Sequence, residues 1–444
     1  MKHFLLTLLA IISFSVSSWA QAAKHVILIT IDGFRPDFYL DKSWGAVNLQ
    51  YLMENGVHAK GVNGIFPTVT FPSHTTLVTG VKAAKHGIYY NDPFEPTGPT
   101  GRWYWHYNAI KSPTIYDAVR QAGLKSASVL WPVTAGAPID YNIPDIWKVG
   151  SQPDRREETS KHATPAGLWQ EIELNATGKL EANDFNMDKD YLVMDDNVAR
   201  MAAYLIRKYR PNFTTVHLPV VDHAEGRDGE QVRRAVTGAD RAIRNIIEAV
   251  DKAGIKNQTA IIVTGDHGFV DGHTAIQPNI WLAQAGLLKD IKKDEWQAQF
   301  QPAGGSAFLY LKDAKDKKTL NRVRQLLAAL PESQQKLFKV IEGAELAKAS
   351  ADPNVALALA AAPGVTFGRA STGEIFRPNS GGNHGYFPNF PKIQTGFIGM
   401  GAGFKKGGFI QEMEMIDVAP IIARLLGLEF KSADGMTYPG LLVK

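Results

Sequence analysis

Mostly apolar runs that lead into aspartate or histidine are the feature of this sequence that most constrains its fold. Residues 26–31 form such a run and lead into Asp32, and residues 259–264 lead through a glycine into Asp266 and His267. Runs of this kind are typical of strands buried in a parallel sheet, whose carboxyl ends meet at one edge. We therefore expect these polar side chains, far apart in sequence, to gather at that edge and to be able to hold a metal ion.

Helical patterns separate the strand-like runs. A helix is predicted over residues 44–55 and ends before Gly56, which occupies a C-cap position. Further helices are predicted over residues 112–122, 191–209 and 231–253, and further strands over 126–130 and 213–218. This alternation predicts an α/β fold with a doubly wound, mostly parallel sheet.

Two stretches interrupt the alternation. Residues 92–111 are rich in proline and glycine and are predicted to form a loop, in which Trp103, Trp105 and Tyr107 either stack on a nucleobase or pack against the core. Residues from about 277 to 379 are predicted to form an inserted subdomain between two of the site segments. Its predicted elements are a strand over 307–311, a helix over 317–330 and an alanine-rich helix near 354–362.

Composition limits the partners and the compartment. The 444 residues carry a net charge of +4 and no cysteine, so neither disulfides nor an obligate nucleic-acid partner is indicated. Residues 1–22 resemble a signal peptide, with a basic start, a short apolar stretch and small residues near the cleavage point; a buried N-terminal helix is the alternative. We expect residues 23–444 to be the mature chain, without a transmembrane segment, in a bacterial periplasm or secreted.

The segment over residues 66–74 places a hydroxyl group among the candidate metal ligands. Thr70 is followed by Phe71 and Pro72, and proline is well tolerated in the first turn of a helix. We expect Thr70 at the N-cap, where free amides and the helix dipole favour an anion such as phosphate. A metal ion can activate such a hydroxyl as a nucleophile. An ordinary N-cap threonine is the alternative, and His74 is expected to pack on the same helix rather than to bind metal.

Together these motifs resemble the type I phosphodiesterase/nucleotide pyrophosphatase family of the alkaline phosphatase superfamily. The resemblance is carried, in order along the chain, by Asp32-Gly33, residues 64–87, Trp131-Pro132, Asp266-His267-Gly268 and Asn383-His384-Gly385-Tyr386. It implies that residues 23–444 form an alkaline-phosphatase-like catalytic domain. It also implies that Thr70 is the nucleophile and that Asn91 helps to hold the phosphoryl oxygens.

The same resemblance implies two zinc ions. The first would be bound by Asp32, Thr70, Asp266 and His267. The second would be bound by Asp222, by a histidine four residues later, and by His384. The sequence departs from the pattern at that histidine, because Gly226 stands there and has no side chain to offer. His223, Glu225 and Asp228 lie nearby, and His223 is the residue we name to replace the missing ligand; weak binding or loss of the second zinc are the alternatives.

These residues predict an exported zinc-dependent phosphodiesterase or nucleotide pyrophosphatase. Its substrates would be small phosphate diesters or pyrophosphates, nucleotides among them, and the reaction would pass through a phospho-threonine intermediate. A phosphate monoesterase is the alternative enzyme, but it needs additional cations. No clear Lys-x-Arg pattern occurs in the region after Trp131-Pro132, and the pair Arg155-Arg156 does not fit that need well, so diesters are favoured. A non-catalytic binding protein is the third hypothesis, and Gly226 is its basis.

Overall fold

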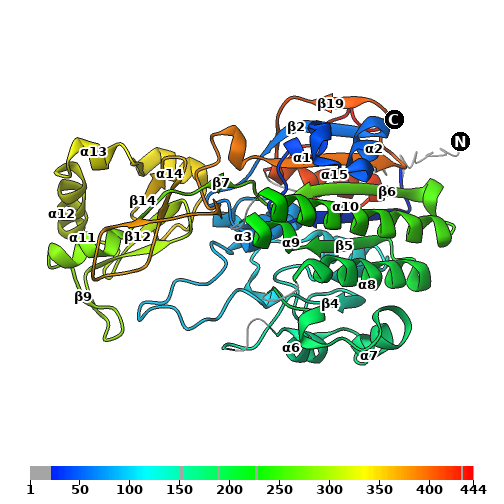
Figure 1. Cartoon of the computed structure of the whole chain (residues 1–444), viewed down its shortest axis with the longest axis horizontal. Coiled ribbons are helices and arrows are strands. Elements are labelled where there is room, and N and C mark those ends of the chain that lie inside the picture. Colours follow the sequence, from blue (N-terminus) through cyan, green and yellow to red (C-terminus); the bar gives the residue numbers. More distant parts are fainter. Residues whose placement is uncertain (1–21, 151–153, 188–190, 226–228, 432–433, 444) are drawn as a thin grey trace, which may run out of the picture.

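The computed structural model describes residues 22–150, 154–187, 191–225, 229–431 and 434–443. A mixed sheet of nine strands lies in the right-hand part of Figure 1. Its order is β19-β2-β18-β6-β1-β5-β3-β4, with β20 paired to β2. The strands β6, β1, β5, β3 and β4 are parallel, whereas β18 is antiparallel to β6 and β2. Their bounds are β1 His25–Ile31, β2 Val57–Asn63, β3 Ser126–Val129, β4 Tyr141–Ile143, β5 Phe213–Leu218, β6 Thr259–Gly265, β18 Thr395–Gly401, β19 Gly408–Ile410 and β20 Met413–Glu414.

Helices cover both faces of this sheet. Alternate side chains of β1 point to opposite faces: Ile27 and Ile29 belong to one apolar core and Val26 and Leu28 to another. The first core includes α2 (Val47–Asn55), α8 (Met194–Tyr209) and α10 (Gly229–Lys252), and the second includes α3 (Thr70–Thr79), α5 (Ile115–Gln121) and α15 (Val418–Leu426). The predicted doubly wound, mostly parallel α/β fold is confirmed.

A second, smaller sheet lies apart from the first, at the left of Figure 1. It is antiparallel, in the order β11-β12-β14-β13. Its strands are β11 Ala298–Pro302, β12 Ser306–Leu311, β13 Phe338–Ile341 and β14 Leu357–Ala361, and the helices beside it are α11 Pro278–Gln284, α12 Lys317–Ala328, α13 Glu332–Gln335 and α14 Gly343–Ala349. These elements lie within residues 277–379, hereafter the inserted segment; that this segment is a subdomain stays a prediction.

The alanine-rich helix predicted near residues 354–362 is wrong, because this stretch contains the strand β14. Leu357 and Leu359 alternate with alanines, and β14 pairs with β12 on one side and β13 on the other. Burial of both faces and two ladders of backbone hydrogen bonds outweigh the helix propensity of alanine.

Other predicted helices begin later than expected. The helix predicted from residue 112 begins at Ile115, where Thr114 and Asp117 form a capping box. The helix predicted from residue 44 begins at Val47, because Gly45 has a φ of 73° and interrupts the turn before it. The first turn predicted at residue 191 is the 3-10 helix η5 (Tyr191–Val193).

The remaining elements are short. The helices are α1 Asp37–Leu40, η1 Lys42–Trp44, α4 Ala83–His86, η2 Tyr107–Ala109, α6 Arg156–His162, α7 Leu168–Ile172, η3 Glu173–Thr177, η4 Ala182–Asp184, α9 Val220–Glu225, η6 Lys256–Gln258, η7 Pro391–Ile393 and η8 Met415–Asp417. The strands are β7 Val270–Asp271, β8 Thr274–Ile276, β9 Leu288–Asp290, β10 Glu295–Trp296, β15 Val365–Phe367, β16 Phe376–Pro378 and β17 Gly382–Asn383. Residues 1–21, nearly all of the predicted signal peptide, lie outside the described residues; in the described part, no helix is long and apolar enough to cross a membrane.

Candidate metal centre and active site

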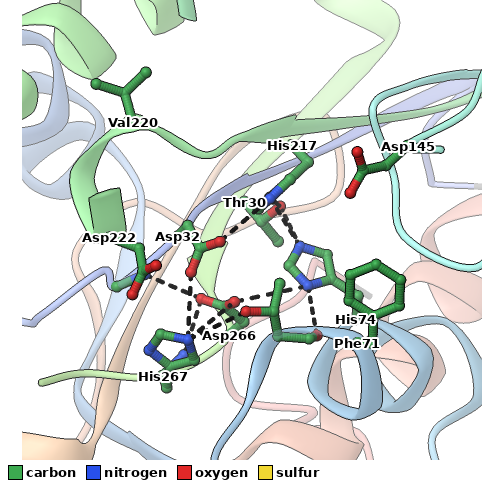
Figure 2. Close-up of polar contacts among 12 residues, drawn as sticks. Thr30, Asp32, Phe71, His74, Asp145, His217, Val220, Asp222, Asp266 and His267 are labelled. Carbon is green, nitrogen blue, oxygen red and sulfur yellow. Dashed lines mark hydrogen bonds and ion pairs between the residues drawn. The ribbon is translucent and has the colours of Figure 1, made fainter. Parts of the chain in front are cut away.

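The register of the central strands brings the first group of predicted ligands together. Ile31 of β1 pairs with Gly265 of β6, so Asp32 and Asp266 leave the sheet at the same level. His267 Nε2 lies 3.3 Å from Asp32 Oδ1 and 3.4 Å from Asp266 Oδ2 (Figure 2). Asp266 Oδ1 accepts hydrogen bonds from the amides of Gly33 and His267, which fix its carboxylate.

The carboxylates of this group are short of partners. Asp32 Oδ1 and Asp266 Oδ2 are buried and accept no hydrogen bond from any described residue. Burial, and then repulsion by Asp266 and Asp222, raise the pKa of Asp32 well above its ordinary value. Buried charges normally have a partner, and two adjacent carboxylates with free oxygens are the environment that a divalent cation stabilises.

The histidine of this group is in the form that binds metal. Burial holds the pKa of His267 well below its ordinary value, so the imidazole is neutral. Its Nδ1 faces Gly268 O at 3.1 Å, which leaves Nε2 toward the carboxylates. Thr70 Oγ1 lies 3.5 Å from the same Nε2. Imidazole, carboxylate and hydroxyl donors around one point suit zinc and other first-row divalent metals.

A second group of donors lies beside the first. Ligand atoms of Asp222, His267 and His384 all lie within 4.8 Å of one another. Asp222 comes from α9, and His384 follows β17 and lies 3.6 Å from Asp222 through Nε2. The rings of His267 and His384 are stacked with centroids 3.9 Å apart. The two groups are therefore contiguous and together can hold a pair of cations.

The residues considered for the missing ligand differ in position. Gly226 and Asp228 lie outside the described residues. His223 lines the same pocket as Asp222, but its ring packs edge-on against Tyr191 with centroids 4.4 Å apart, and it belongs to neither group of donors. The side chain of Glu225, like Gly226 and Asp228, lies outside what the structure describes, and no third protein ligand of its own is found at the second group among the side chains that are described.

The candidate nucleophile Thr70 lies at the start of a helix, one residue after the N-cap position that the sequence predicted for it. Thr70 is the first residue of α3, and Val69 is the N-cap residue, with extended backbone at φ −130°. Asn91 Oδ1 accepts a hydrogen bond of 2.9 Å from the amide of Phe71. The Nδ2 group of Asn91 has no partner among the described residues, so it is free to donate to a ligand beside Thr70.

A buried polar network lies behind the site. Thr30 Oγ1 lies 2.9 Å from His74 Nε2 and 3.1 Å from His217 Nδ1, and His217 Nε2 lies 3.4 Å from Asp32 Oδ2 (Figure 2). His74 Nδ1 donates to Thr70 O at 2.8 Å. Burial lowers the pKa of both His74 and His217 to about 3, so both are neutral. His217 was missed by the sequence analysis, although a histidine within the apolar run of β5 is a signal that could have identified it.

An aromatic pocket of ≈ 200 Å³ opens beside Thr70. Phe71, Trp103 and Trp147 line it, with centroids 5.1 Å apart for Phe71–Trp103 and 4.9 Å for Trp103–Trp147. Of Trp103, Trp105 and Tyr107, the aromatic residues considered for stacking on a nucleobase, only Trp103 lines this pocket. Trp105 is buried behind Trp147, and the Tyr107 hydroxyl donates to Asp117 outside the pocket.

One arginine reaches this pocket. Arg155, only 8% exposed, forms an ion pair with Asp145, and its guanidinium lies 4.4 Å from the centroid of Trp147. Burial raises the pKa of Asp145, and Arg155 opposes that rise. Arg155 Nε is buried without a hydrogen-bond partner. From the sequence alone, the pair Arg155-Arg156 was a poor fit to the cations that a monoesterase needs.

Comparison with known proteins assigns the chain to a class. The model of the type I phosphodiesterase/nucleotide pyrophosphatase family matches residues 26–387, so the chain belongs to this family and the predicted resemblance is confirmed. It is 28% identical over 288 residues, 63% of its length, to an uncharacterised pyrophosphatase/phosphodiesterase of Schizosaccharomyces pombe, covering 50% of that protein. It is 27% identical to human ectonucleotide pyrophosphatase/phosphodiesterase family member 5 over 59% of its length, covering 48% of that protein.

A longer match of 25% identity links 91% of the chain to 44% of a venom phosphodiesterase of Naja atra. The chain thus spans about half the length of the curated relatives it matches. Among solved structures, human ectonucleotide pyrophosphatase/phosphodiesterase 5 superposes with a TM-score of 0.66 at 21% identity, covering 93% of this chain and 97% of that chain. An inactive form of the murine protein in complex with AMP gives 0.63 at 21% identity, covering 92% and 96%. The fold is therefore the alkaline-phosphatase-like fold that was expected.

Proposed function

We propose that the protein is a zinc-dependent phosphodiesterase/nucleotide pyrophosphatase that uses Thr70 as its nucleophile. The observation that carries this proposal is the pair of contiguous donor groups beside Thr70, with two buried carboxylate oxygens that have no hydrogen-bond partner. Family membership supports the same reaction class. The first zinc would be held by Asp32, Thr70, Asp266 and His267, and the second by Asp222 and His384.

The residues then have separate tasks. Zinc, when bound, supplies positive charge that favours the ionised threonine and offsets charge on the phosphate. Thr70 Oγ attacks phosphorus, a phospho-threonine bond forms, and the bond from phosphorus to the leaving oxygen breaks with its electron pair. Asn91 donates through Nδ2 to a phosphoryl oxygen, and its Oδ1, bound to the amide of Phe71, fixes the direction of that donor. Water then hydrolyses the phospho-threonine and restores the hydroxyl.

The substrate would be a small phosphate diester or pyrophosphate, with nucleotides as the first class to test. The rings of Phe71, Trp103 and Trp147 offer flat faces beside Thr70, on which a base can stack. The complex of the murine neighbour with AMP is consistent with this assignment. We further propose that an N-terminal signal peptide directs export of the chain to a bacterial periplasm or the exterior. A chain without cysteine needs no disulfides to fold in either compartment.

A phosphate monoesterase is the second candidate, and Arg155 is the observation that favours it. A monoester carries one more negative charge than a diester, and Arg155 provides one cation within the pocket that also contains Thr70. Because Asp145 already compensates this cation, we favour the diester. The third hypothesis, a binding protein without turnover, rests on Gly226 alone.

One experiment separates the three hypotheses. The purified chain is loaded with zinc, its metal content is measured, and kcat/KM is compared for bis(4-nitrophenyl) phosphate and 4-nitrophenyl phosphate. Preference for the diester supports the proposal. If the wild type prefers the monoester, and this preference is lost in Arg155→Met but kept in Arg156→Met, the protein is the phosphate monoesterase. If the chain binds zinc but hydrolyses neither ester, the hypothesis of a binding protein without turnover is supported.

A further inference from the structure

A second pocket, of ≈ 250 Å³, meets the aromatic pocket at Asn91 and His384. It lies between the catalytic sheet and the inserted segment, because Val69 and Asn91 line one side and Ala303 and Gly304 the other. A phosphate attacked by Thr70 would lie where these two pockets join. A substrate has two groups on its reacting phosphorus, and the two pockets provide one place for each.

Among the described residues that line this second pocket, Arg369 is the one permanent cation. Its Nη2 donates to both oxygens of Asp92, at 2.9 and 3.1 Å, and its Nη1 donates to Gln301 Oε1 at 2.8 Å. Its Nε has no partner among the described residues. Asp92 follows Asn91 directly, so this ion pair lies next to the residue proposed to hold the phosphoryl oxygens.

The Arg369–Asp92 pair can be exchanged at low cost. The two side chains are 40% and 20% exposed, and ion pairs in contact with solvent contribute little to stability. Gln301 is buried and neutral, so it continues to hold the guanidinium if the carboxylate is displaced. A phosphate group offers the guanidinium the same paired oxygens with more charge. The pair Arg155–Asp145 differs, because both partners are buried and breaking it would leave an unpaired charge.

We propose that this second pocket binds the phosphate adjacent to the one under attack. When that phosphate binds, the guanidinium of Arg369 releases Asp92 and pairs with the phosphate instead. The inference rests on the proposed function and narrows its substrates to pyrophosphates, such as nucleoside triphosphates, in preference to diesters with uncharged groups. The aromatic pocket then takes the organic group and the Arg369 pocket takes the departing phosphate chain.

The test uses two substrates that share their nucleoside and reacting phosphate: thymidine 5′-triphosphate and the 4-nitrophenyl ester of thymidine 5′-monophosphate. The quantity compared is the ratio of kcat/KM for the triphosphate to kcat/KM for the ester. In Arg369→Met this ratio should fall about tenfold or more, the effect expected for loss of a charged hydrogen bond. In Asp92→Asn the same ratio should rise, because the arginine loses its competitor. Arg377→Met is the control: Arg377 lies in the same segment, outside the pocket, bonded to Thr372 O.

The outcomes separate the subsite from the proposed function. Equal falls for both substrates in Arg369→Met would mean that Arg369 only positions the loop of Asn91, and they would overturn the subsite. The same ratio in Arg369→Met and Arg377→Met, or a lower ratio in Asp92→Asn, would overturn it too. If the wild type hydrolyses neither substrate, the proposed function fails; binding of inorganic pyrophosphate to the zinc-loaded chain, with and without Arg369→Met, then decides the subsite, and equal affinities refute it.

Discussion

Removal of the His217 imidazole tests whether the network behind the site sets its affinity for metal. His217 Nε2 faces Asp32 Oδ2 at 3.4 Å, and its Nδ1 is held by Thr30 at 3.1 Å. Asp32 Oδ1 has no partner of its own. In His217→Leu the Asp32 carboxylate therefore loses the contact that orients it, although the apolar volume of the site is largely kept.

The expected effect follows from the role of such residues elsewhere. Loss of a group that orients a metal ligand typically weakens metal binding by about 10–100-fold, which is about 1.4–2.7 kcal/mol. Loss of one of the two histidine contacts of the buried Asp32 carboxylate also lowers the free energy of unfolding of the metal-free chain by about 1 kcal/mol. We therefore expect His217→Leu to lower the zinc affinity and the metal-free Tm together.

The assay is competition for zinc with a chelator of known affinity, combined with thermal unfolding. The matched control is His25→Leu. His25 lies at the opposite end of the sheet, is also buried, and makes one hydrogen bond, from Nδ1 to Pro211 O at 2.8 Å. This control should lose about 1 kcal/mol of stability and keep its zinc affinity. Equal zinc affinities in the two variants and the wild type would refute a role for His217 behind Asp32.

Three further predictions concern the nucleophile, a buried carboxyl and the second zinc. Thr70→Ala should slow turnover by several orders of magnitude while Asp32, Asp266 and His267 retain zinc; unchanged turnover would remove the covalent mechanism. Burial raises the pKa of Asp195 from 3.8 to about 8, so the folded chain holds this proton more tightly than the unfolded chain, and stability present below about pH 4 is lost as the pH rises to about 8. Asp195→Asn should therefore raise Tm relative to the wild type more at pH 9 than at pH 4, and equal shifts at both pH values would contradict this. Gly226→His should raise the zinc content toward two per chain, unless elemental analysis finds two tightly held ions in the wild type.

The sequence was enough to predict the position of a site residue where the direction of a strand alone determines that position. Asp32 and Asp266 follow runs that are long enough, and apolar enough, to be parallel strands, and parallel register then brings their side chains together. The assignment of His384 and Asp222 to one second metal site came from the family resemblance and not from chain direction. The structure brings them within reach of His267, but no apolar run predicts that placement.

What the sequence left out depends on contacts between segments of unrelated pattern. Arg155 reaches the pocket because Trp147 and Asp145 hold its guanidinium, and neither contact has a sequence signature. The stretch near residues 354–362 has the composition of a helix, yet neighbouring strands on both sides make it β14. Local propensity fails there because partners distant in sequence decide the outcome.

The inserted segment contacts the backbone of His384 in the second group of donors, and Gly304→Ala tests whether this contact positions His384. Gly304 has a φ of 67°, and a Cβ there would lie 2.1 Å from His384 O, while the amide of Gly305 donates to that same oxygen at 2.8 Å. Gly286→Ala is the control, because Gly286 has a φ of 68° with nothing within 4 Å of the added Cβ. Both variants bear the left-handed strain of about 1–2 kcal/mol, but only Gly304→Ala must displace the backbone of His384. We expect Gly304→Ala to lose turnover and the zinc proposed at Asp222 and His384, while the zinc proposed at Asp32 and Asp266 remains. The same zinc content and turnover in both variants would show that the inserted segment does not position His384.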